Sequence, residues 1–400
     1  MKQLLALCAA LAAIPGIASA DTPAENPDST GFTFTDVKVV KTTPVKDQNK
    51  SGTCWSFSGT SFIEDEIMRK GGPELDLSEM FTVRHCYDDK ADKYIRMDGK
   101  INFAQGGGAQ DILYVIKNYG MVPEDVYSGL NYGEEKHSHY ELADGLTGYM
   151  NGILRNGNKK LSTAWKNGVD GILDAYFGKL PEKFTYNGKT YTPKEFAKAM
   201  NINPDDYICI TSYTHHPFYQ TFPLEVADNW LWWPYMNVPM EEMKAIVDNA
   251  INNGYSVEWS ADVSEGGFKW RKGFAVLPEE VNEKDLNGTE LSRWVTLSDK
   301  ERADKRFDIK GPVKEVKVTQ ESRQRSFDNK ETTDDHGMTI VGIATDQEGN
   351  RYYKVKNSWD TNQIYGGYFY VSEPYFLDKT LGIMVNKEAV PSKISAKFNK

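Results

Sequence analysis

Cysteine, clustered basic residues and long apolar runs are all scarce in this sequence. Only four of the 400 residues are cysteines. Acidic residues outnumber basic ones by 57 to 47, and the Lys and Arg residues are dispersed, which excludes a nucleic-acid-binding surface. After residue 20, no apolar run approaches the ~20 residues that span a bilayer, which excludes a membrane anchor. Internal repeats and low-complexity tracts are also missing.

The first 20 residues have the pattern of a secretory signal. Lys2 precedes an apolar core, and the small residues Ala18, Ser19 and Ala20 form a cleavage site. We therefore expect cleavage near Ala20 and an exported protein, periplasmic or secreted. Residues 21–33 are rich in Pro, Asp, Ser and Thr, which predicts a flexible segment ahead of a domain that spans residues 34–400.

The cysteines of the exported chain would be Cys54, Cys86 and Cys209. An odd number of cysteines in an exported protein indicates a free, reactive thiol. Cys86 and Cys209 could pair or remain two buried thiols, and both possibilities stay open. Cys54 is the candidate for the free thiol because of the residues around it.

Cys54 lies between a polar turn and an amphipathic run that predicts a helix to about Arg69, ended by the glycines at 71 and 72. At a helix start, unpaired N–H groups and the helix dipole favour a thiolate. Gln48, six residues upstream, could direct its amide at an oxyanion formed beside the sulfur. This stretch therefore offers a nucleophile and a group to stabilise the charge that it creates.

A base and a group to orient it occur far downstream. His336 begins an apolar, strand-like run, and Asn357 ends an alternating strand 21 residues later. A catalytic cysteine needs a base, and the base needs a third group that fixes its ring. Asn357 could hold one ring nitrogen of His336 while the other faces Cys54, with Trp359 shielding that bond from water.

The order Cys, His and Asn, with these motifs, resembles the papain superfamily of cysteine peptidases. The match rests on Gln48, residues 54–58, residues 77–79, His336 and residues 357–359. The chain is most similar to the bleomycin hydrolase and aminopeptidase C branch, from about Thr43 to Pro391. That narrower resemblance rests on residues 107–113, 119–123, 237–240 and 258–263, and on Ser51, where many papain-like enzymes have a cysteine.

The resemblance implies an α+β papain-like fold. Its helical left half and barrel-like right half would enclose an active-site cleft. The spacing from Cys54 to His336 is about twice the ~130–150 residues of a compact papain-like enzyme. We therefore expect a large insertion at about residues 133–230, mainly helical, with a small hairpin at residues 184–191. A second helix is expected from about Gln110 to Asn118.

The resemblance also implies the roles of the site residues. Cys54 would attack a peptide carbonyl, His336 would transfer protons, Asn357 would orient the imidazole, and Gln48 would bind the oxyanion. Gly107 and Gly108 would let a substrate backbone lie alongside. No metal or organic cofactor is required.

Two pairs of histidines raise the possibility of a metal site. They are His137 with His139 and His215 with His216, and no cysteine or carboxylate cluster at ligand spacing accompanies them. We expect surface or packing roles for all four. Residues 230–235, rich in Trp, are expected to belong to the core or to a subunit interface.

The resemblance implies an aminopeptidase that assembles as a hexamer and acts on peptides. In relatives, a C-terminal arm lies in the cleft and its carboxylate docks the substrate amino group. Only nine residues follow Pro391 here, which looks shorter than that arm, so endopeptidase action with an open cleft stays an alternative. A non-peptidase amide hydrolase or acyltransferase would pair Cys and His with Asp, against Asn357. A non-catalytic binding homologue would be free to lose these residues.

Overall fold

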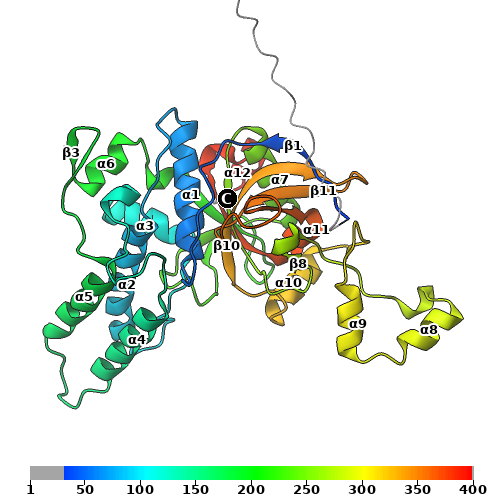
Figure 1. The fold of residues 1–400 in the computed structure, drawn as a ribbon, viewed down its shortest axis with the longest axis horizontal. Coiled ribbons are helices and arrows are strands. Elements are labelled where there is room, and N and C mark those ends of the chain that lie inside the picture. Colours follow the sequence, from blue (N-terminus) through cyan, green and yellow to red (C-terminus); the bar gives the residue numbers. More distant parts are fainter. Residues whose placement is uncertain (1–30, 399–400) are drawn as a thin grey trace, which may run out of the picture.

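The computed structural model describes residues 31–398 and shows two halves side by side (Figure 1). The helices of the first half are α1 (Cys54–Arg69), α2 (Glu79–Arg96), α3 (Gln110–Asn118), α4 (Tyr140–Leu154), α5 (Ala164–Phe177) and α6 (Pro193–Ala199). The remaining helices are α7 (Met240–Asn252), α8 (Gly288–Trp294), α9 (Asp299–Arg306), α10 (Gln320–Asp328), α11 (Glu373–Lys379) and α12 (Ser392–Ser395). The papain-like α+β arrangement expected from the sequence is therefore confirmed.

The second half is built on one sheet of 11 strands in the order β5-β6-β4-β13-β7-β10-β11-β12-β9-β8, with β1 paired to β10. The strands are β1 (Thr35–Val39), β4 (Tyr207–Thr211), β5 (Thr221–Pro223), β6 (Pro234–Asn237), β7 (Val257–Ala261), β8 (Phe268–Lys269), β9 (Phe274–Ala275), β10 (His336–Thr345), β11 (Arg351–Lys356), β12 (Tyr368–Ser372) and β13 (Thr380–Asn386). Antiparallel pairing on both sides of β10, with β7 and β11, places that strand inside the sheet.

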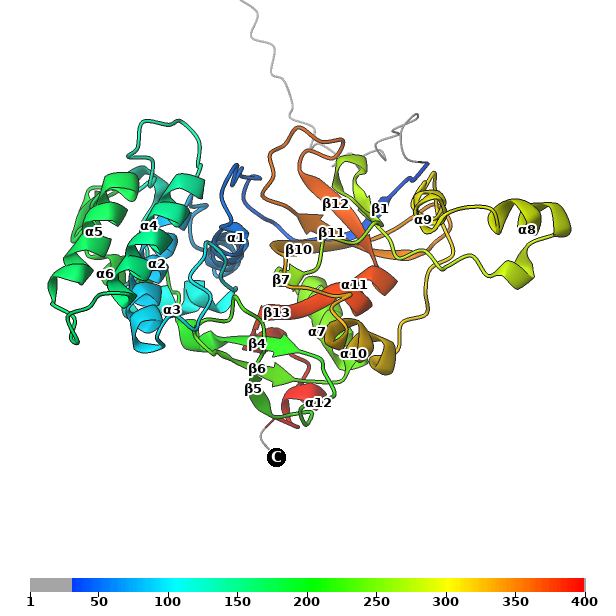
Figure 2. The ribbon, with the colours of Figure 1, turned by 90° about the horizontal axis from the view of Figure 1, so that it is seen from below.

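Helix α1 connects the two halves. Residues 55–67 are all buried, because one side of the helix packs against the helical half and the other against β10. The helix ends as expected: Gly71 has φ +82°, a conformation that favours glycine, and the Gly72 N–H caps the Ile67 carbonyl at 2.9 Å. Figure 2 shows α1 between the helical half and the sheet.

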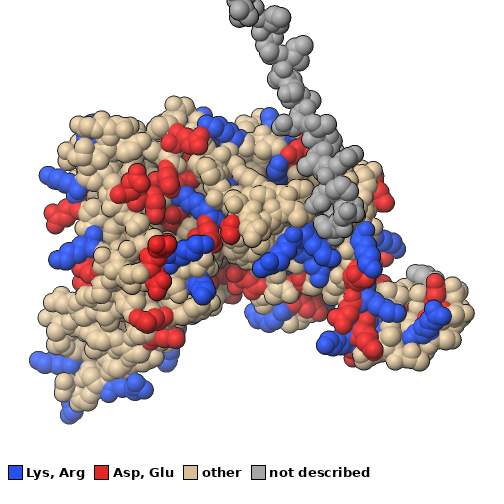
Figure 3. Space-filling model, viewed as in Figure 1, with Lys and Arg blue, Asp and Glu red and all other residues tan. Residues whose placement is uncertain are grey.

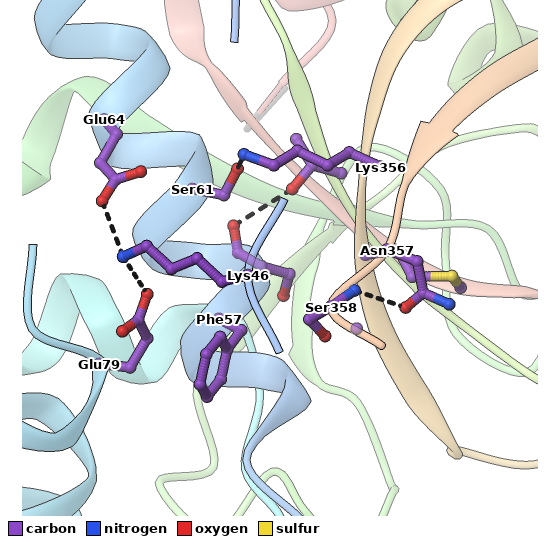
Figure 4. Close-up of a pocket in the computed structure, with 12 residues that line it drawn as sticks. Lys46, Phe57, Ser61, Glu64, Glu79, Lys356, Asn357 and Ser358 are labelled. Carbon is purple, nitrogen blue, oxygen red and sulfur yellow. Dashed lines mark hydrogen bonds and ion pairs between the residues drawn. The ribbon is translucent and has the colours of Figure 1, made fainter. Parts of the chain in front are cut away.

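Buried charges lie between the halves in a small cavity (Figure 4). Lys46 Nζ lies 2.7 Å from a Glu79 oxygen and 3.3 Å from a Glu64 oxygen. Across the cavity, Lys356 Nζ donates to Ser61 Oγ at 2.9 Å. Because an unpaired charge is costly to bury, these contacts favour one docking geometry of α1 on the sheet.

The closest approach of α1 to the sheet is at Gly337, the second residue of β10. A Cβ there would lie 2.7 Å from Ser58 Oγ, 3.2 Å from the Trp55 Cα and 3.3 Å from a Glu258 oxygen. Ser58 Oγ itself donates to Glu258 Oε1 at 2.9 Å. The start of α1 therefore packs directly on the backbone of β10, and a larger residue at position 337 would force neighbouring atoms to shift.

The expected insertion at residues 133–230 is mainly helical in its first part. Helices α4, α5 and α6 extend the helical half, and β2 (Phe184–Tyr186) with β3 (Lys189–Tyr191) forms the expected hairpin. Its last part instead contributes β4 and β5 to the large sheet. The start of the described chain also differs from expectation: Phe32, placed in a flexible segment, is buried between Phe34 and Phe274.

Helices α8 and α9 form an arm that projects from the sheet half (Figures 1 and 2). Neither helix has a buried residue among those described, so the arm contributes little to the core. On the face seen in Figure 3, acidic and basic side chains are interspersed, on this arm and elsewhere.

Cys86 and Cys209 are free and buried, which decides between the two possibilities left open by the sequence. Among residues 31–398, no helix has the length and apolar character needed to cross a membrane.

Replacing Gly337 with Ala should lower the free energy of unfolding by about 1–3 kcal/mol, because the methyl group would overpack the contact between α1 and β10. Urea denaturation measures the change. Gly152→Ala is the matched control, since a Cβ on this exposed α4 residue meets no atom within 4 Å. We expect the control to be neutral or to stabilise by up to ~1 kcal/mol. Equal effects of the two substitutions would contradict the proposed close approach.

Candidate active site

Cys54 is the first residue of α1 and stays partly open to solvent. The backbone N–H groups of Trp55 and Gly337 point at its sulfur. The first comes from the unpaired N–H groups of the helix start and the second from the adjoining strand. The docking of α1 on β10 thus places Cys54 beside the residue that follows His336.

His336 and Asn357 meet at neighbouring strand ends. His336 begins β10, Asn357 directly follows β11, and His336 Nε2 lies 2.7 Å from Asn357 Oδ1. The Ser358 N–H also donates to Asn357 Oδ1, at 2.7 Å, which orients the amide so that its oxygen faces the ring. His336 Nε2 therefore carries the proton, and Nδ1 is left with a lone pair to accept one.

Trp359 covers this pair. Its ring centroid lies 4.4 Å from that of His336, with the planes tilted by 32°. His336 and Asn357 are both buried, at 4% and 2% exposure, so the bond between them is shielded from water as the sequence suggested. The exposed part of Trp359 lines a surface hollow with Trp270 and Lys272, where a substrate could lie against it.

Gln48 is held in place from both ends of its amide. Ser358 Oγ donates to Gln48 Oε1 at 2.7 Å, and Gln48 Nε2 donates to the Ser51 carbonyl at 2.7 Å. An amide nitrogen carries two hydrogens, so one of them remains for another acceptor. Ser358 thus sets the orientation of both Gln48 and Asn357. The sequence analysis gave this serine no role, although it lies between Asn357 and Trp359.

The expectation of a thiolate at the helix start was wrong for the resting site. Burial raises the pKa of Cys54 to about 12, outweighing the backbone donors at Gly337 and Trp55 that lower it. Burial likewise lowers the pKa of His336 to about 4, against the raising effect of Asn357. Both shifts favour a neutral thiol and a neutral imidazole over the ion pair. A helix start alone does not create a thiolate once the sulfur is desolvated.

Gly107 and Gly108, the glycines expected to bind substrate, belong with Gly106 to a glycine strip at residues 106–108. This strip lies beside Trp55. Trp55 Nε1 donates to the Gln105 carbonyl at 3.0 Å, and a Cβ on Gly107 would lie 2.8 Å from the Trp55 ring. Gly107 is therefore next to the neighbour of Cys54, as expected for a substrate-binding residue. A Cβ on Gly108 would meet only the flexible side chain of Gln110 at closest range. Gly108 leads into α3 and shows no such contact with the nucleophile's helix.

Three acidic side chains surround the site and were missed by the sequence analysis. Asp228 lies against Gly106, Asp334 precedes His336 by two residues, and Glu258 lies beneath Gly337. The charges of Asp228 and Asp334 both raise the pKa of Cys54. A buried acid on an apolar strand, as at Glu258, is a signal that sequence inspection could have used.

Neither histidine pair takes part in these hydrogen bonds, although the His137 ring packs edge-on against Phe57 of α1 with centroids 6.3 Å apart. His137 and His139 are buried, whereas the Nε2 atoms of His215 and His216 contact the Glu225 carboxylate at 3.0 and 2.7 Å. No carboxylate at ligand spacing was expected near them, and Glu225 corrects that expectation. These three side chains could together hold a metal ion. However, the Gln324 amide faces His215 Nδ1, which places the ring proton on Nε2, where a metal would have to bind.

Comparison with protein families gives an independent result. The model of the Peptidase C1-like family matches residues 12–278 and 306–400. The unmatched stretch between these ranges corresponds to most of the α8–α9 arm. The expected insertion at residues 133–230 lies within the match.

Individual relatives are distant but cover most of the chain. Aminopeptidase C of Lactobacillus helveticus is 23% identical, over 88% of this chain and 81% of its own. Bleomycin hydrolase of Rattus norvegicus is 24% identical, over 88% of this chain and 82% of its own. The crystal structure of PepW from Lactobacillus rhamnosis HN001 is similar in fold, with a TM-score of 0.68 and 19% identity, covering 91% of this chain and 84% of that chain.

The contact between Ser358 and Gln48 predicts a measurable coupling. Ser358→Ala would leave the buried Gln48 oxygen without its donor, so a double-mutant cycle with Gln48→Ala should give about 1 kcal/mol of interaction free energy. Urea denaturation of the four proteins measures it. Pairing Gln48→Ala with Ser292→Ala on the distant α8 should be additive. A coupling near zero for Ser358 would contradict the hydrogen bond.

Proposed function

We propose, since the chain belongs to the peptidase C1-like family, that it is a cysteine peptidase that removes amino-terminal residues from peptides through Cys54. The observation that supports the proposal is that Cys54, at the start of α1, lies beside Gly337, while the preceding His336 lies 2.7 Å from Asn357 Oδ1. The names of the relatives, aminopeptidase C and bleomycin hydrolase, support peptide substrates and an amino-terminal site of action.

The first step is acylation. His336 Nδ1 takes the proton of the Cys54 thiol as the sulfur attacks the substrate carbonyl carbon, and the carbonyl oxygen becomes an oxyanion. Collapse of this intermediate breaks the C–N bond, and His336 returns the proton to the leaving amine. The neutral resting pair suits this order, because the proton moves only when the sulfur reacts.

The oxyanion needs donors in the same place. The free hydrogen of Gln48 Nε2 and the backbone N–H of Cys54, at the start of α1, would supply them. Ser358 holds Gln48 in that orientation before the substrate arrives. Such preorganised donors stabilise the charge without reorganising during the reaction.

Deacylation uses the same base. His336 Nδ1 takes a proton from water, the water oxygen attacks the acyl carbon, and the C–S bond breaks to release the carboxylic acid product and the Cys54 thiol. Asn357 keeps the imidazole plane fixed through both steps. Trp359 limits the access of bulk water to the bond between His336 and Asn357.

The described C-terminal segment packs away from the start of α1. Ile394 and Phe398 lie against the core of the sheet half, and Lys397 pairs with Glu242 of α7. Figure 2 shows this end beside α12 and β5, across the sheet from α1. Up to Phe398, the C-terminal segment therefore places no group beside Cys54.

Export is proposed on the sequence alone, from the signal-like residues 1–20, which lie outside the described residues. Assembly as a hexamer likewise stays a prediction from the resemblance.

Replacing Cys54 with Ala should abolish hydrolysis of an alanyl-aminomethylcoumarin substrate, by at least ~10⁴-fold, because no other group can form the acyl-enzyme. Fluorescence of the released coumarin measures the rate. Since Cys54 is partly exposed, the free energy of unfolding should change by less than ~0.5 kcal/mol. Cys86→Ala, at a free but buried thiol, is the control and should retain activity. Activity that survives Cys54→Ala would contradict the proposal.

Activity should persist to lower pH than an ordinary histidine would allow. The base must be neutral to accept the thiol proton, and burial lowers the pKa of His336 to about 4. We therefore expect kcat, measured at saturating substrate, to fall as pH drops through about 4, with little loss between pH 7 and 5. Circular dichroism at each pH separates this from unfolding. An acid limb near the ordinary value of about 6.5 would show instead that His336 is solvated.

A further inference from the structure

We propose that Asp228, Asp334 and Glu258 form an anionic subsite beside Cys54 that binds the α-ammonium group of the residue to be removed. This inference rests on the proposed function and adds to it the group that recognises the amino terminus. The subsite consists of three side chains from three separate segments of the chain.

Asp228 lies at the end of the glycine strip. A Cβ on Gly106 would lie 2.0 Å from its Oδ2, so the carboxylate contacts the strip backbone directly. Asn102 Nδ2 donates to its other oxygen, Oδ1, at 2.7 Å and holds the carboxylate in position. Gly107, the next residue of the strip, packs on Trp55 beside Cys54. The Asp228 carboxylate therefore lies at one end of the glycine strip. The strip connects it to Trp55, the residue next to Cys54.

The loop that carries Asp228 is anchored just after that residue. Trp230 Nε1 donates to Asp111 Oδ2 at 2.7 Å, and Tyr235 Oη donates to Gln110 Oε1 at 2.7 Å. Both partners belong to α3, which directly follows the glycine strip. The loop and the strip thus form one rigid wall of the cleft, and Asp228 is fixed on it rather than carried on a free loop.

Asp334 contributes from the segment that leads into β10, two residues before His336. It is partly buried, and none of the described residues provides it with a hydrogen bond or ion pair. Burial and the charge of Asp228 raise its pKa to about 7. The contribution of Asp228 indicates that the two carboxylates are close enough for their charges to interact.

Glu258 lies at the base of this space, on β7. It is fully buried, and its Oε1 accepts from Ser58 and lies close to Gly337. Its second oxygen, Oε2, is buried without a hydrogen-bond partner among residues 31–398. Burial and the charge of Asp334 raise its pKa to about 8. A buried carboxylate oxygen that lacks a partner among residues 31–398, close to Gly337, is the observation that points to a cationic ligand.

The nearby protein cation does not fill this role. Lys90 lowers the pKa of Asp228, but its ammonium donates to the carbonyls of Ala104 and Gly106 on the strip. Lys90 therefore offsets the charge of Asp228 only. It provides no positive partner for Asp334 or Glu258. A substrate ammonium placed between these side chains would favour their ionised forms and bind through charge-assisted hydrogen bonds.

The position of Asp228 favours the α-ammonium over a side-chain cation. When a substrate backbone lies along Gly107, its amino-terminal end reaches Asp228. This is because the Asp228 carboxylate lies at Gly106, the end of the strip. A longer peptide would have to displace that contact. The subsite thus limits the cleft to a residue with a free amino terminus.

The test compares three substrates: alanyl-aminomethylcoumarin, its N-acetyl derivative, and N-acetyl-arginyl-alanyl-aminomethylcoumarin, which offers a cation one residue further on. The variants are Asp228→Asn and Asp334→Asn, which keep the shape and remove the charge. Asp144→Asn, at an exposed residue of α4, is the matched control. Urea denaturation confirms that each variant is folded.

We expect the unmodified protein to prefer the free alanyl substrate over its acetyl derivative by at least ~100-fold in kcat/KM. Each cleft variant should lower kcat/KM for the free substrate about 10- to 100-fold, and should lower the free-to-acetyl ratio at least ~10-fold. Asp144→Asn should change neither value. Equal rates for free and acetylated substrates, unchanged selectivity in both cleft variants, or a preference for the arginyl substrate would each overturn the inference.

Binding separates this inference from the proposed function. Alanine amide should bind to the Cys54→Ala protein more tightly than acetyl-alanine amide, by at least ~10-fold in Kd measured calorimetrically, and Asp228→Asn should remove the difference. Equal binding of the two amides would overturn the subsite even if Cys54-dependent hydrolysis is observed. Selective binding without any hydrolysis would support the subsite and refute the peptidase.

Discussion

The contact between the start of α1 and Gly337 is the constraint on which the rest of the site depends. Because position 337 has no side chain, Trp55 and Ser58 can rest on the backbone of β10. That approach brings the Gly337 N–H to the Cys54 sulfur and His336 to the same cleft. A nucleophile from one half and a base from the other are brought together only by the docking of the two halves.

Charges buried between the halves make this docking specific. Lys46 pairs with Glu64 and Glu79 from the helical half, while Lys356 of β11 donates to hydroxyl groups that include Ser61 of α1. Such groups add little net stability, since desolvation offsets much of their attraction. A shift of α1 would nevertheless leave a buried charge without its partner. We infer that the network penalises alternative positions of α1 more than it stabilises the observed one.

The sequence was sufficient to predict what lies within short motifs. The helix at Cys54, the strand at His336 and the pairing of His336 with Asn357 follow from local patterns and from the resemblance to a known family. The state of the thiol could not be predicted, because it depends on how far docking desolvates the sulfur. The roles of Ser358 and Asp228 were also missed, since both arise from contacts between residues more than 100 positions apart.

The acidic groups of the cleft show why such contacts matter for function. Gathering Asp228, Asp334 and Glu258 near one another costs free energy, because burial and like charge both oppose ionisation. Stability alone would favour neutral side chains here, and an apolar side chain at position 258 would be buried at lower cost than Glu258. A cation that enters with the substrate removes this cost at the moment of binding. The electrostatic cost of grouping these carboxylates therefore becomes selectivity for a charged amino terminus. Asp228 and Asp334, which raise the pKa of Cys54, would have their charge offset once the substrate is bound.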